Sequence, residues 1–274
     1  MIEKKHLNAV VFDLDDTLLH DDRTISGFSI SVFRNLHQAG FTFIAASGRA
    51  QLSMKPYIDQ LSCVSAYIAC NGAEIWDAQT HRLLRCDMIP ASTAKEIALF
   101  AEENDCYAHV YDGDSFFFNR YSEHSVRYSA SSKLKGVYAG KLSRFIKEDR
   151  NKIILIDDQE KIASLYRTAS KRFAGKASVT CSKPIYLEFN PLNSSKGNAL
   201  RYVSSILGLQ CDGFIAFGDS LNDLSMLQEA GHAVTVSNGW KEIRPFCDAV
   251  CGSNNDDGPA RYLYQHFLSE EVAK

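Results

Sequence analysis

The chain has 274 residues, of which 45% are hydrophobic and 23% charged, a globular composition long enough for two domains. Its formal net charge of −3 lacks the basic excess of nucleic-acid-binding proteins, so we expect no nucleic-acid partner. The start, MIEKKHLNAVVFDLDD, has too short an apolar run for a signal peptide, and no segment reaches the roughly 18 apolar residues that span a bilayer. With eight scattered cysteines and no CxxC pair, these features predict a cytoplasmic protein with reduced thiols and no membrane partner.

The first third of the chain alternates apolar and amphipathic segments. Strand-like apolar runs lie at 8–14, 41–46 and 66–70, and helical spacing of apolar residues occurs at 26–39 and 51–61. Nearly continuous apolar strands between amphipathic helices are typical of a parallel sheet covered on both faces.

The middle of the chain has a different pattern. AEIWD and HRLLRCDMI predict a hairpin, and YAHVY and SFFFN flank a second turn at Asp112-Gly113. Helices are expected at 92–103, where Thr93 and Glu96 fit a capping box, and at 160–172. The aromatic run Phe116-Phe117-Phe118 belongs to the interior, or one ring faces a ligand. The middle therefore predicts an α+β unit with antiparallel pairing.

The first pattern returns after residue 195. A helix is expected at 196–207, a strand at GFIAFGDS, a helix at 223–230, a strand at HAVTV and a closing helix around 261–268. The whole chain therefore predicts a doubly wound parallel sheet that is interrupted by an insert and then resumed.

Two carboxylates follow the first strand. Asp13 and Asp15 share one face if the strand continues, at the edge where doubly wound sheets bind ligands. At about 4 Å, two carboxylates repel by roughly 4 kcal/mol at an effective dielectric of about 20. A cation or a retained proton would relieve this repulsion, as in phosphoryl transfer by a carboxylate nucleophile beside Mg²⁺. An acidic helix cap with Thr17 is the alternative, and these residues alone leave both open.

A second acidic pair follows the strand FIAFG. Asp219 and Asp223 are four residues apart and Gly218 permits a tight loop, so both carboxylates can face one point at a helix start. Ordinary capping by Asp219 would also explain the first of them. Two acidic clusters at two strand ends nevertheless favour an oxygen-rich Mg²⁺ site.

Candidate phosphate donors follow the second strand and open a later helix. Ser47 offers a hydroxyl, and Gly48 lets backbone N–H groups approach an anion. Lys196 stands at a helix start, where the helix dipole disfavours a cation unless an anionic ligand or acidic neighbours compensate.

The segments FDLDDTLL, ASGR, SSKGNAL and GDSLNDLSM occur in this order. Together they resemble the four motifs of the haloacid dehalogenase-like phosphatases, and NGAEI with the large insert resembles the Cof-type (type IIB cap) subfamily. The resemblance covers essentially the whole chain. It implies an α/β fold with a Rossmann-like doubly wound core from residues 1–84 and 187–274, and an inserted α/β cap at 85–186.

The resemblance also implies residue roles. Asp13 would be the nucleophile that forms an aspartyl-phosphate, and Asp15 the acid and base. The metal ligands would be Asp13, Asp15 through its backbone carbonyl, and Asp219, while Asp223 would bind Mg²⁺ through water or orient Lys196.

The phosphoryl oxygens would be held by Ser47 and Lys196, with Gly48 beside them and Asn222 as a further candidate. Cof-type proteins usually have Gly where this chain has Asp16, which we expect to shape the turn.

Arg49 and Asn71 have two readings each. Arg49 would contact substrate or form a salt bridge, and Asn71 would lie near the site or simply form the Asn-Gly turn. Cap residues Tyr107, Tyr111 and 112–120 are the region where we expect specificity.

The implied activity is Mg²⁺-dependent hydrolysis of small phosphorylated metabolites, with sugar phosphates first and flavin mononucleotide or pyridoxal phosphate next. A phosphotransferase or phosphomutase is the enzymatic alternative, and a phosphoacceptor switch is a non-enzymatic one. The oligomeric state is open.

Overall fold

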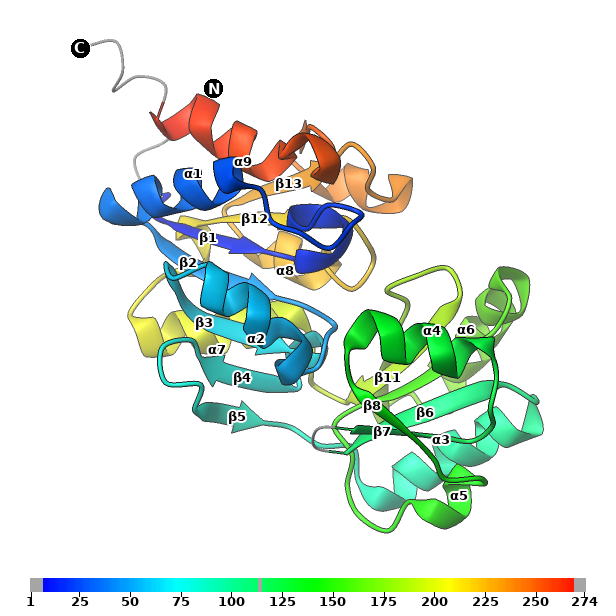
Figure 1. The fold of residues 1–274 in the computed structure, drawn as a ribbon. Coiled ribbons are helices and arrows are strands. Elements are labelled where there is room, and N and C mark those ends of the chain that lie inside the picture. The colour runs from blue at the N-terminus through cyan, green and yellow to red at the C-terminus, as the bar shows by residue number, and fades with distance from the viewer. Residues whose placement is uncertain (1–6, 113–114, 269–274) are drawn as a thin grey trace.

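The computed structural model describes residues 7–112 and 115–268, and Figure 1 shows two bodies, each built around its own sheet. We call the body with the eight-stranded sheet the core and the body with the six-stranded sheet the insert. The core sheet has the order β14-β13-β12-β1-β2-β3-β4-β5. Its strands are β1 (Ala9–Phe12), β2 (Thr42–Ala46), β3 (Val64–Ala69), β4 (Glu74–Asp77), β5 (Leu83–Cys86), β12 (Phe214–Gly218), β13 (His232–Val236) and β14 (Ala249–Cys251).

The core sheet is buried on both faces. β14 to β3 pair in parallel, whereas β4 and β5 add antiparallel strands at one edge. On β1, Val10 and Phe12 pack with α1 (Gly27–Gln38), α2 (Gln51–Gln60) and α9 (Gly258–Leu263). Ala9 and Val11 point to the other face, which α7 (Lys196–Leu207) and α8 (Leu224–Glu229) cover. Two-sided burial explains the continuous apolar strands, and the doubly wound prediction is confirmed.

The insert sheet has the order β10-β11-β9-β6-β7-β8. Its pairs are antiparallel as predicted, except that β7 and β8 run parallel. One face packs against α3, α5 and α6, while α4 covers the other with an aromatic cluster. The strands are β6 (Tyr107–Asp112), β7 (Ser115–Phe118), β8 (Lys135–Tyr138), β9 (Ile153–Ile156), β10 (Ala177–Thr180) and β11 (Tyr186–Pro191); the helices are α3 (Ala91–Glu103), α4 (Glu123–Ser132), α5 (Leu142–Phe145) and α6 (Gln159–Arg172).

Short helical turns complete the described chain. They are η1 (Leu14–Leu18), η2 (Cys70–Gly72), η3 (Cys211–Gly213), η4 (Lys241–Phe246), η5 (Asn254–Asp256) and η6 (Tyr264–Leu268).

Strand pairing moves the domain boundaries. β5 lies in the core sheet and ends at Cys86, while β11 pairs with β9 and β10 of the insert and ends at Pro191. The predicted limits at 85 and 187 therefore cut through two strands. We propose instead that the insert runs from about residue 87 to residue 191, between β5 and the approach to α7.

The predicted capping box at Thr93 is wrong, because α3 already begins at Ala91, whose backbone N–H donates to the Asp149 carboxylate at 2.8 Å. The second predicted hairpin is confirmed by the antiparallel pairing of β6 and β7, in which Asp112 is still a strand residue opposite Ser115. Gly113 of the predicted turn lies outside the described residues.

In the described part of the chain no helix is long and apolar enough to cross a membrane. All eight cysteines are free thiols.

Candidate active site

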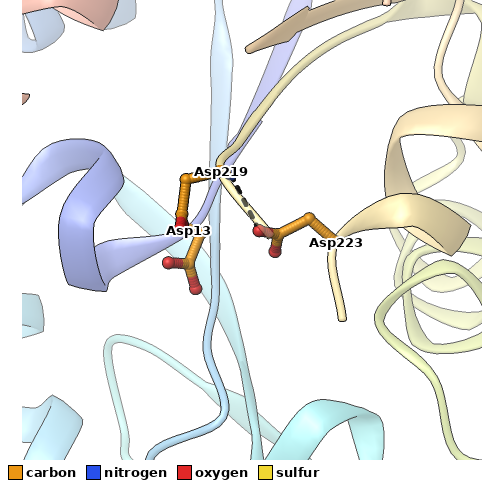
Figure 2. A group of neighbouring side chains, drawn as sticks. All are labelled: Asp13, Asp219 and Asp223. Carbon is orange, nitrogen blue, oxygen red and sulfur yellow. Dashed lines mark hydrogen bonds between the residues drawn. The ribbon is translucent and has the colours of Figure 1, made fainter. Parts of the chain in front are cut away.

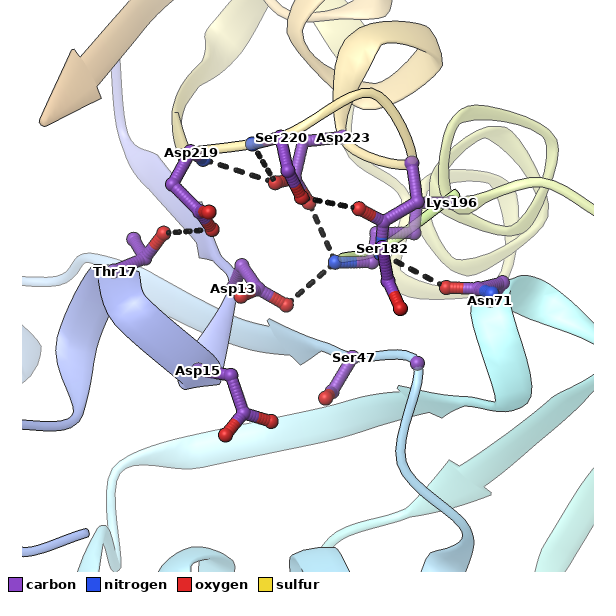
Figure 3. A network of polar contacts seen from close by, with 12 residues as sticks. Asp13, Asp15, Thr17, Ser47, Asn71, Ser182, Lys196, Asp219, Ser220 and Asp223 are labelled. Carbon is purple, nitrogen blue, oxygen red and sulfur yellow. Dashed lines mark hydrogen bonds and ion pairs between the residues drawn. The ribbon is translucent and has the colours of Figure 1, made fainter. Parts of the chain in front are cut away.

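A cleft of about 700 Å³, counting space open to solvent, lies between the core and the insert. Its core side is formed where β1, β2 and β12 end, because Asp13, Ser47 and Asp219 each directly follow one of these strands. Since carboxyl ends of parallel strands share one edge of a sheet, residues distant in sequence converge here (Figure 3).

Asp13 is 4% exposed and extends the β1 ladder, with its backbone N–H donating to the carbonyl of Phe217 at 3.0 Å. Its Oδ1 accepts from Nζ of Lys196 at 2.5 Å. The same ammonium donates to Oδ1 of Asp223, also at 2.5 Å. The fully buried Lys196 therefore bridges two carboxylates, which explains a lysine at the start of α7 (Figure 3).

Asp13, Asp219 and Asp223 form a buried acidic cluster whose carboxylate oxygens lie within 4.8 Å of one another (Figure 2). Oδ1 of Asp219 accepts from the Thr17 hydroxyl at 2.9 Å. Oδ2 of Asp223 accepts from the backbone N–H groups of Asp219 and Ser220 at 2.9 and 3.1 Å. Both oxygens of Asp223 thus have protein partners, whereas Asp13 and Asp219 each keep one oxygen without one among the described residues.

The negative charge of the three carboxylates in the acidic cluster is not balanced by the single ammonium of Lys196. Burial raises the pKa of Asp13 to about 8, with Asp223 and Asp15 adding to the rise against the opposing effect of Lys196. Burial and the neighbouring carboxylates also hold the pKa of Asp219 well above its ordinary value. Burial alone would lower the pKa of Lys196, but its two carboxylates raise it, so the ammonium is charged. Three acids sharing one ammonium favour an added cation or a retained proton.

Asp15 has a different environment, two residues away. Arg49 donates to both of its oxygens, at 2.6 and 2.7 Å, and Arg23 donates to Oδ1 as well. Burial works against ionisation, but the Arg49 guanidinium, with Arg23 and Lys183, lowers the pKa of Asp15. Of the two predicted roles of Arg49, the structure contains the salt bridge, which Arg49 forms with Asp15. Asp16 adopts φ +59° inside the turn, a conformation that Asp tolerates.

The loop after β2 places Ser47 and Gly48 in the cleft. The Ser47 hydroxyl oxygen accepts from the backbone N–H of Arg49 at 3.2 Å, closing a tight turn. Gly48 faces the insert, since a Cβ at this position would lie 3.0 Å from Oδ1 of Asn71 and 3.5 Å from Nζ of Lys152.

Asn71 is not part of a two-residue Asn-Gly hairpin turn, because residues 70–73 separate the paired residues Ala69 and Glu74. It lies in the η2 turn between β3 and β4 at φ +56°, and its side chain reaches the cleft region. Its Oδ1 accepts from Asn222 at 3.0 Å, and its Nδ2 donates to Glu188 of the insert at 2.5 Å. Asn222, which lies in the chain between Asp219 and Asp223, lines the cleft.

The insert side of the cleft was only partly expected. Tyr111 lines the cleft as predicted, whereas Tyr107 and the described residues of 112–120 do not, so no ring of Phe116-Phe117-Phe118 faces it. Sequence reasoning missed several other lining residues. Charged residues within apolar strands were the available signal for two of them, in KIILI and YLEFN. The missed residues, from both sides of the cleft, are Arg23, Ala50, Ser53, Tyr128, Ser131, Ser132, Lys152, Ser182, Lys183, Tyr186, Glu188 and Ser220.

Comparison with known proteins finds relatives that match almost the whole chain. The HMP-PP phosphatase of Serratia proteamaculans is 28% identical over 94% of this chain and 94% of its own. The pyridoxal phosphate phosphatase YbhA of Escherichia coli is 23% identical over 95% of this chain and 98% of its own length. Among solved structures, TM0651 of Thermotoga maritima has 29% identity and a TM-score of 0.78, covering 94% of this chain and 97% of its own.

A haloacid dehalogenase subclass IIB sugar phosphatase has a TM-score of 0.82 over 95% of this chain and 98% of its own, at 18% identity, which shows the shared fold. The model of the haloacid dehalogenase-like hydrolases matches residues 10–263. The expected resemblance and the expected enzyme class are confirmed, and the chain belongs to the haloacid dehalogenase-like hydrolases.

Proposed function

We propose that the protein is a Mg²⁺-dependent phosphomonoester hydrolase that acts on small phosphorylated metabolites through an aspartyl-phosphate. The observation that carries this proposal is the buried Asp13, which has one oxygen on Lys196 and belongs to an acidic cluster in which Asp13 and Asp219 line the cleft. The phosphatase names of the relatives support the same reaction class.

The acidic cluster fits a hard divalent cation. Its three carboxylates are oxygen ligands, they are buried, and two of them have pKa values raised by the crowding. Asp13 and Asp219 would bind the metal through their oxygens without protein partners, and the backbone carbonyl of Asp15 would be a third ligand. Asp223 would instead orient Lys196 and the loop, because its two oxygens are already engaged. When bound, Mg²⁺ would supply positive charge beside the nucleophile and the phosphoryl group.

Asp13 would attack phosphorus, forming the acyl phosphate as the ester oxygen leaves. Lys196 holds the Asp13 carboxylate in one orientation and, remaining charged, would stabilise the charge on the phosphoryl oxygens. Ser47 and the Gly48 backbone would bind the remaining phosphoryl oxygens from the opposite side.

Asp15 would then move the proton. Its ionised form, favoured by Arg49 and Arg23, is the form that deprotonates water in the second step. To protonate the leaving group in the first step its pKa must rise. A substrate phosphate that competes for these two guanidinium groups would produce that rise.

The leaving group would lie against the insert. Tyr128 and Tyr186 have ring centroids 6.2 Å apart, and Nζ of Lys183 lies 5.6 Å from the Tyr186 centroid. Lys183 is half-buried, and of the cleft-lining cations it is the one with no carboxylate within ion-pair distance among the described residues. Rings and a free ammonium support a ring-bearing leaving group with an acceptor or anionic substituent. Both sugar phosphates and phosphorylated heterocycles satisfy this description.

A panel of phosphorylated metabolites tests the proposal, with purified protein assayed for phosphate release with and without Mg²⁺. We expect Mg²⁺-dependent release, abolished in D13N with no loss of folding. D16N is the matched control, because Asn also tolerates the left-handed turn and Asp16 has no assigned chemical role. Mg²⁺-dependent hydrolysis that persists in D13N would overturn the nucleophile assignment, and transfer to added alcohols in preference to water would indicate the phosphotransferase alternative.

A further inference from the structure

A buried ion pair of the insert reaches across to the core. Lys152 immediately precedes β9 and is 0% exposed; Glu188 lies on β11 and is 2% exposed. Nζ of Lys152 lies 2.9 Å from Oε2 of Glu188. Neither residue takes part in the proposed catalytic steps, although both border the cleft.

Lys152 contacts residues 47–49 after β2, which we call the phosphate-binding loop. Its ammonium donates to the backbone carbonyl of Gly48 at 2.7 Å. This contact fixes the direction of the peptide that joins Gly48 to Arg49, and hence of the Arg49 N–H that donates to Ser47. A Cβ at Gly48 would lie in tight contact with Oδ1 of Asn71, at 3.0 Å, and in ordinary contact with Nζ of Lys152, at 3.5 Å.

Glu188 is linked through two side-chain amides to residues 219–223, which we call the metal loop. Its Oε2 accepts from Nδ2 of Asn71 at 2.5 Å, and Oδ1 of Asn71 accepts from Nδ2 of Asn222 at 3.0 Å. Asn222 precedes Asp223, and its Oδ1 accepts from the Ser220 hydroxyl at 2.6 Å. One continuous series of contacts therefore runs from the phosphate-binding loop, through the insert, to the loop that holds the acidic cluster.

Stability alone is a weak reason for such a pair. Desolvating two charges offsets most of their attraction, and apolar residues of similar volume are often equally stable or more so. The Glu188 carboxylate is fully used, since Oε1 also accepts from the Ser182 hydroxyl at 2.5 Å. A buried network with this degree of satisfaction fixes geometry, and here the fixed groups belong to the two loops of the candidate site.

We propose that Lys152 and Glu188 are positioning residues of the active site. Supplied by the insert, they hold the Gly48 carbonyl and the Asn71–Asn222 pair. The phosphate-binding loop and the metal loop thus acquire their joint geometry only when the insert is seated on the core. This inference rests on the proposed function, because it assigns these loops to phosphate and metal.

The test uses the double variant K152M/E188L in the full chain. It removes both charges together and so leaves no unpaired buried charge, which favours folding. We expect a folded protein with a lower melting temperature, because Gly48, Asn71 and Ser182 each lose a hydrogen-bond partner. We also expect a kcat/KM lower by about 10–100-fold, as for losses of supporting contacts around metal sites, and weaker binding of inorganic phosphate by calorimetry in the presence of Mg²⁺.

The matched control is R172M/E103Q, which removes an exposed ion pair between α3 and α6 on the other face of the insert sheet. It should keep wild-type kinetics and phosphate affinity. A folded K152M/E188L variant with wild-type kcat/KM and phosphate affinity would overturn the inference.

If K152M/E188L does not fold, K152M/E188Q decides with the same two readouts, because it also removes both charges and keeps a polar side chain of the same shape at position 188. Unchanged values again reject the inference. A wild-type protein that releases no phosphate from any compound in the panel would instead refute the proposed function, so the two failures are distinguishable.

Discussion

His109 gives the sharpest prediction outside the cleft. It lies on β6 of the insert, 0% exposed, and neither ring nitrogen has a hydrogen-bond partner among the described residues. Aromatic rings surround it, with centroids 4.1 Å away for Tyr128 and 5.0 Å for Phe116. Burial, reinforced by the charge of Lys152, lowers the pKa of His109 from 6.5 to about 3. The folded protein therefore holds this imidazole neutral.

The sign of the pH effect follows from that depression. Above pH 6.5 the imidazole of His109 is neutral in both the folded and the unfolded state, and its contribution to stability is fully present. As the pH falls below 6.5 the unfolded chain binds a proton that the folded state refuses, so the free energy of unfolding decreases. Between about pH 7.5 and about pH 5.5 the loss amounts to about 1.4 kcal/mol, on average about half the limiting slope for one proton, which is about 1.4 kcal/mol per pH unit.

The assay compares wild type with H109L by urea unfolding across this pH range. Because other titrating groups are common to both proteins, the difference between their unfolding free energies isolates His109. Wild type should lose about 1.4 kcal/mol relative to H109L, and H37L controls for the removal of one exposed histidine. Parallel pH profiles for wild type and H109L would refute the reasoning, since they would mean that the folded state protonates His109 as readily as the unfolded chain does.

Two further predictions concern the cleft. G48A should lower kcat/KM at least tenfold, because its Cβ would lie 3.0 Å from Oδ1 of Asn71 and 3.5 Å from Nζ of Lys152. Steady-state kinetics and a melting curve check this prediction. Unchanged kinetics would contradict the crowding at this position. The overpacking should cost about 1–3 kcal/mol of stability. K183M should raise KM about tenfold for substrates whose leaving group carries a second anionic group, matching a charge-assisted hydrogen bond of about 1.5 kcal/mol. KM for substrates without that group should stay unchanged, and an equal rise for both kinds would show that Lys183 does not contact the leaving group.

The core was predictable because its signals are local. A parallel strand buried on both faces must be apolar along its whole length, and the segments around Val10, Phe43 and Ile215 show this without knowledge of their partners. The carboxyl-end rule then places Asp13 and Asp219 together once the strands are known. The insert boundary was less accessible, because membership of β11 in the insert sheet depends on pairing with β9, about 30 residues earlier.

The supporting residues of the site were not predictable in the same way. Lys152 and Glu188 each look like a single charge in an apolar strand, and only their contact across the insert, and with Gly48 across the cleft, gives them meaning. Thr93 shows the opposite error: its local capping signal was sound, but Asp149 of a distant loop caps an earlier start of the helix.

The charges of the candidate site divide into two groups that match the two halves of the proposed reaction. Three carboxylates share Lys196 in the acidic cluster, which leaves two negative charges for a divalent cation to neutralise. Without that cation the cluster keeps a proton, which is the physical meaning of an Asp13 pKa of about 8. Asp15, by contrast, faces two guanidinium groups, one of which also pairs with Asp16. With Lys183 added, this side of the cleft carries one net positive charge for a phosphate dianion. The two carboxylates that follow β1 therefore have different partners. Asp13 binds the ammonium of Lys196, which suits it to metal-assisted attack. Asp15 binds the guanidinium groups of Arg23 and Arg49, which suits it to proton transfer.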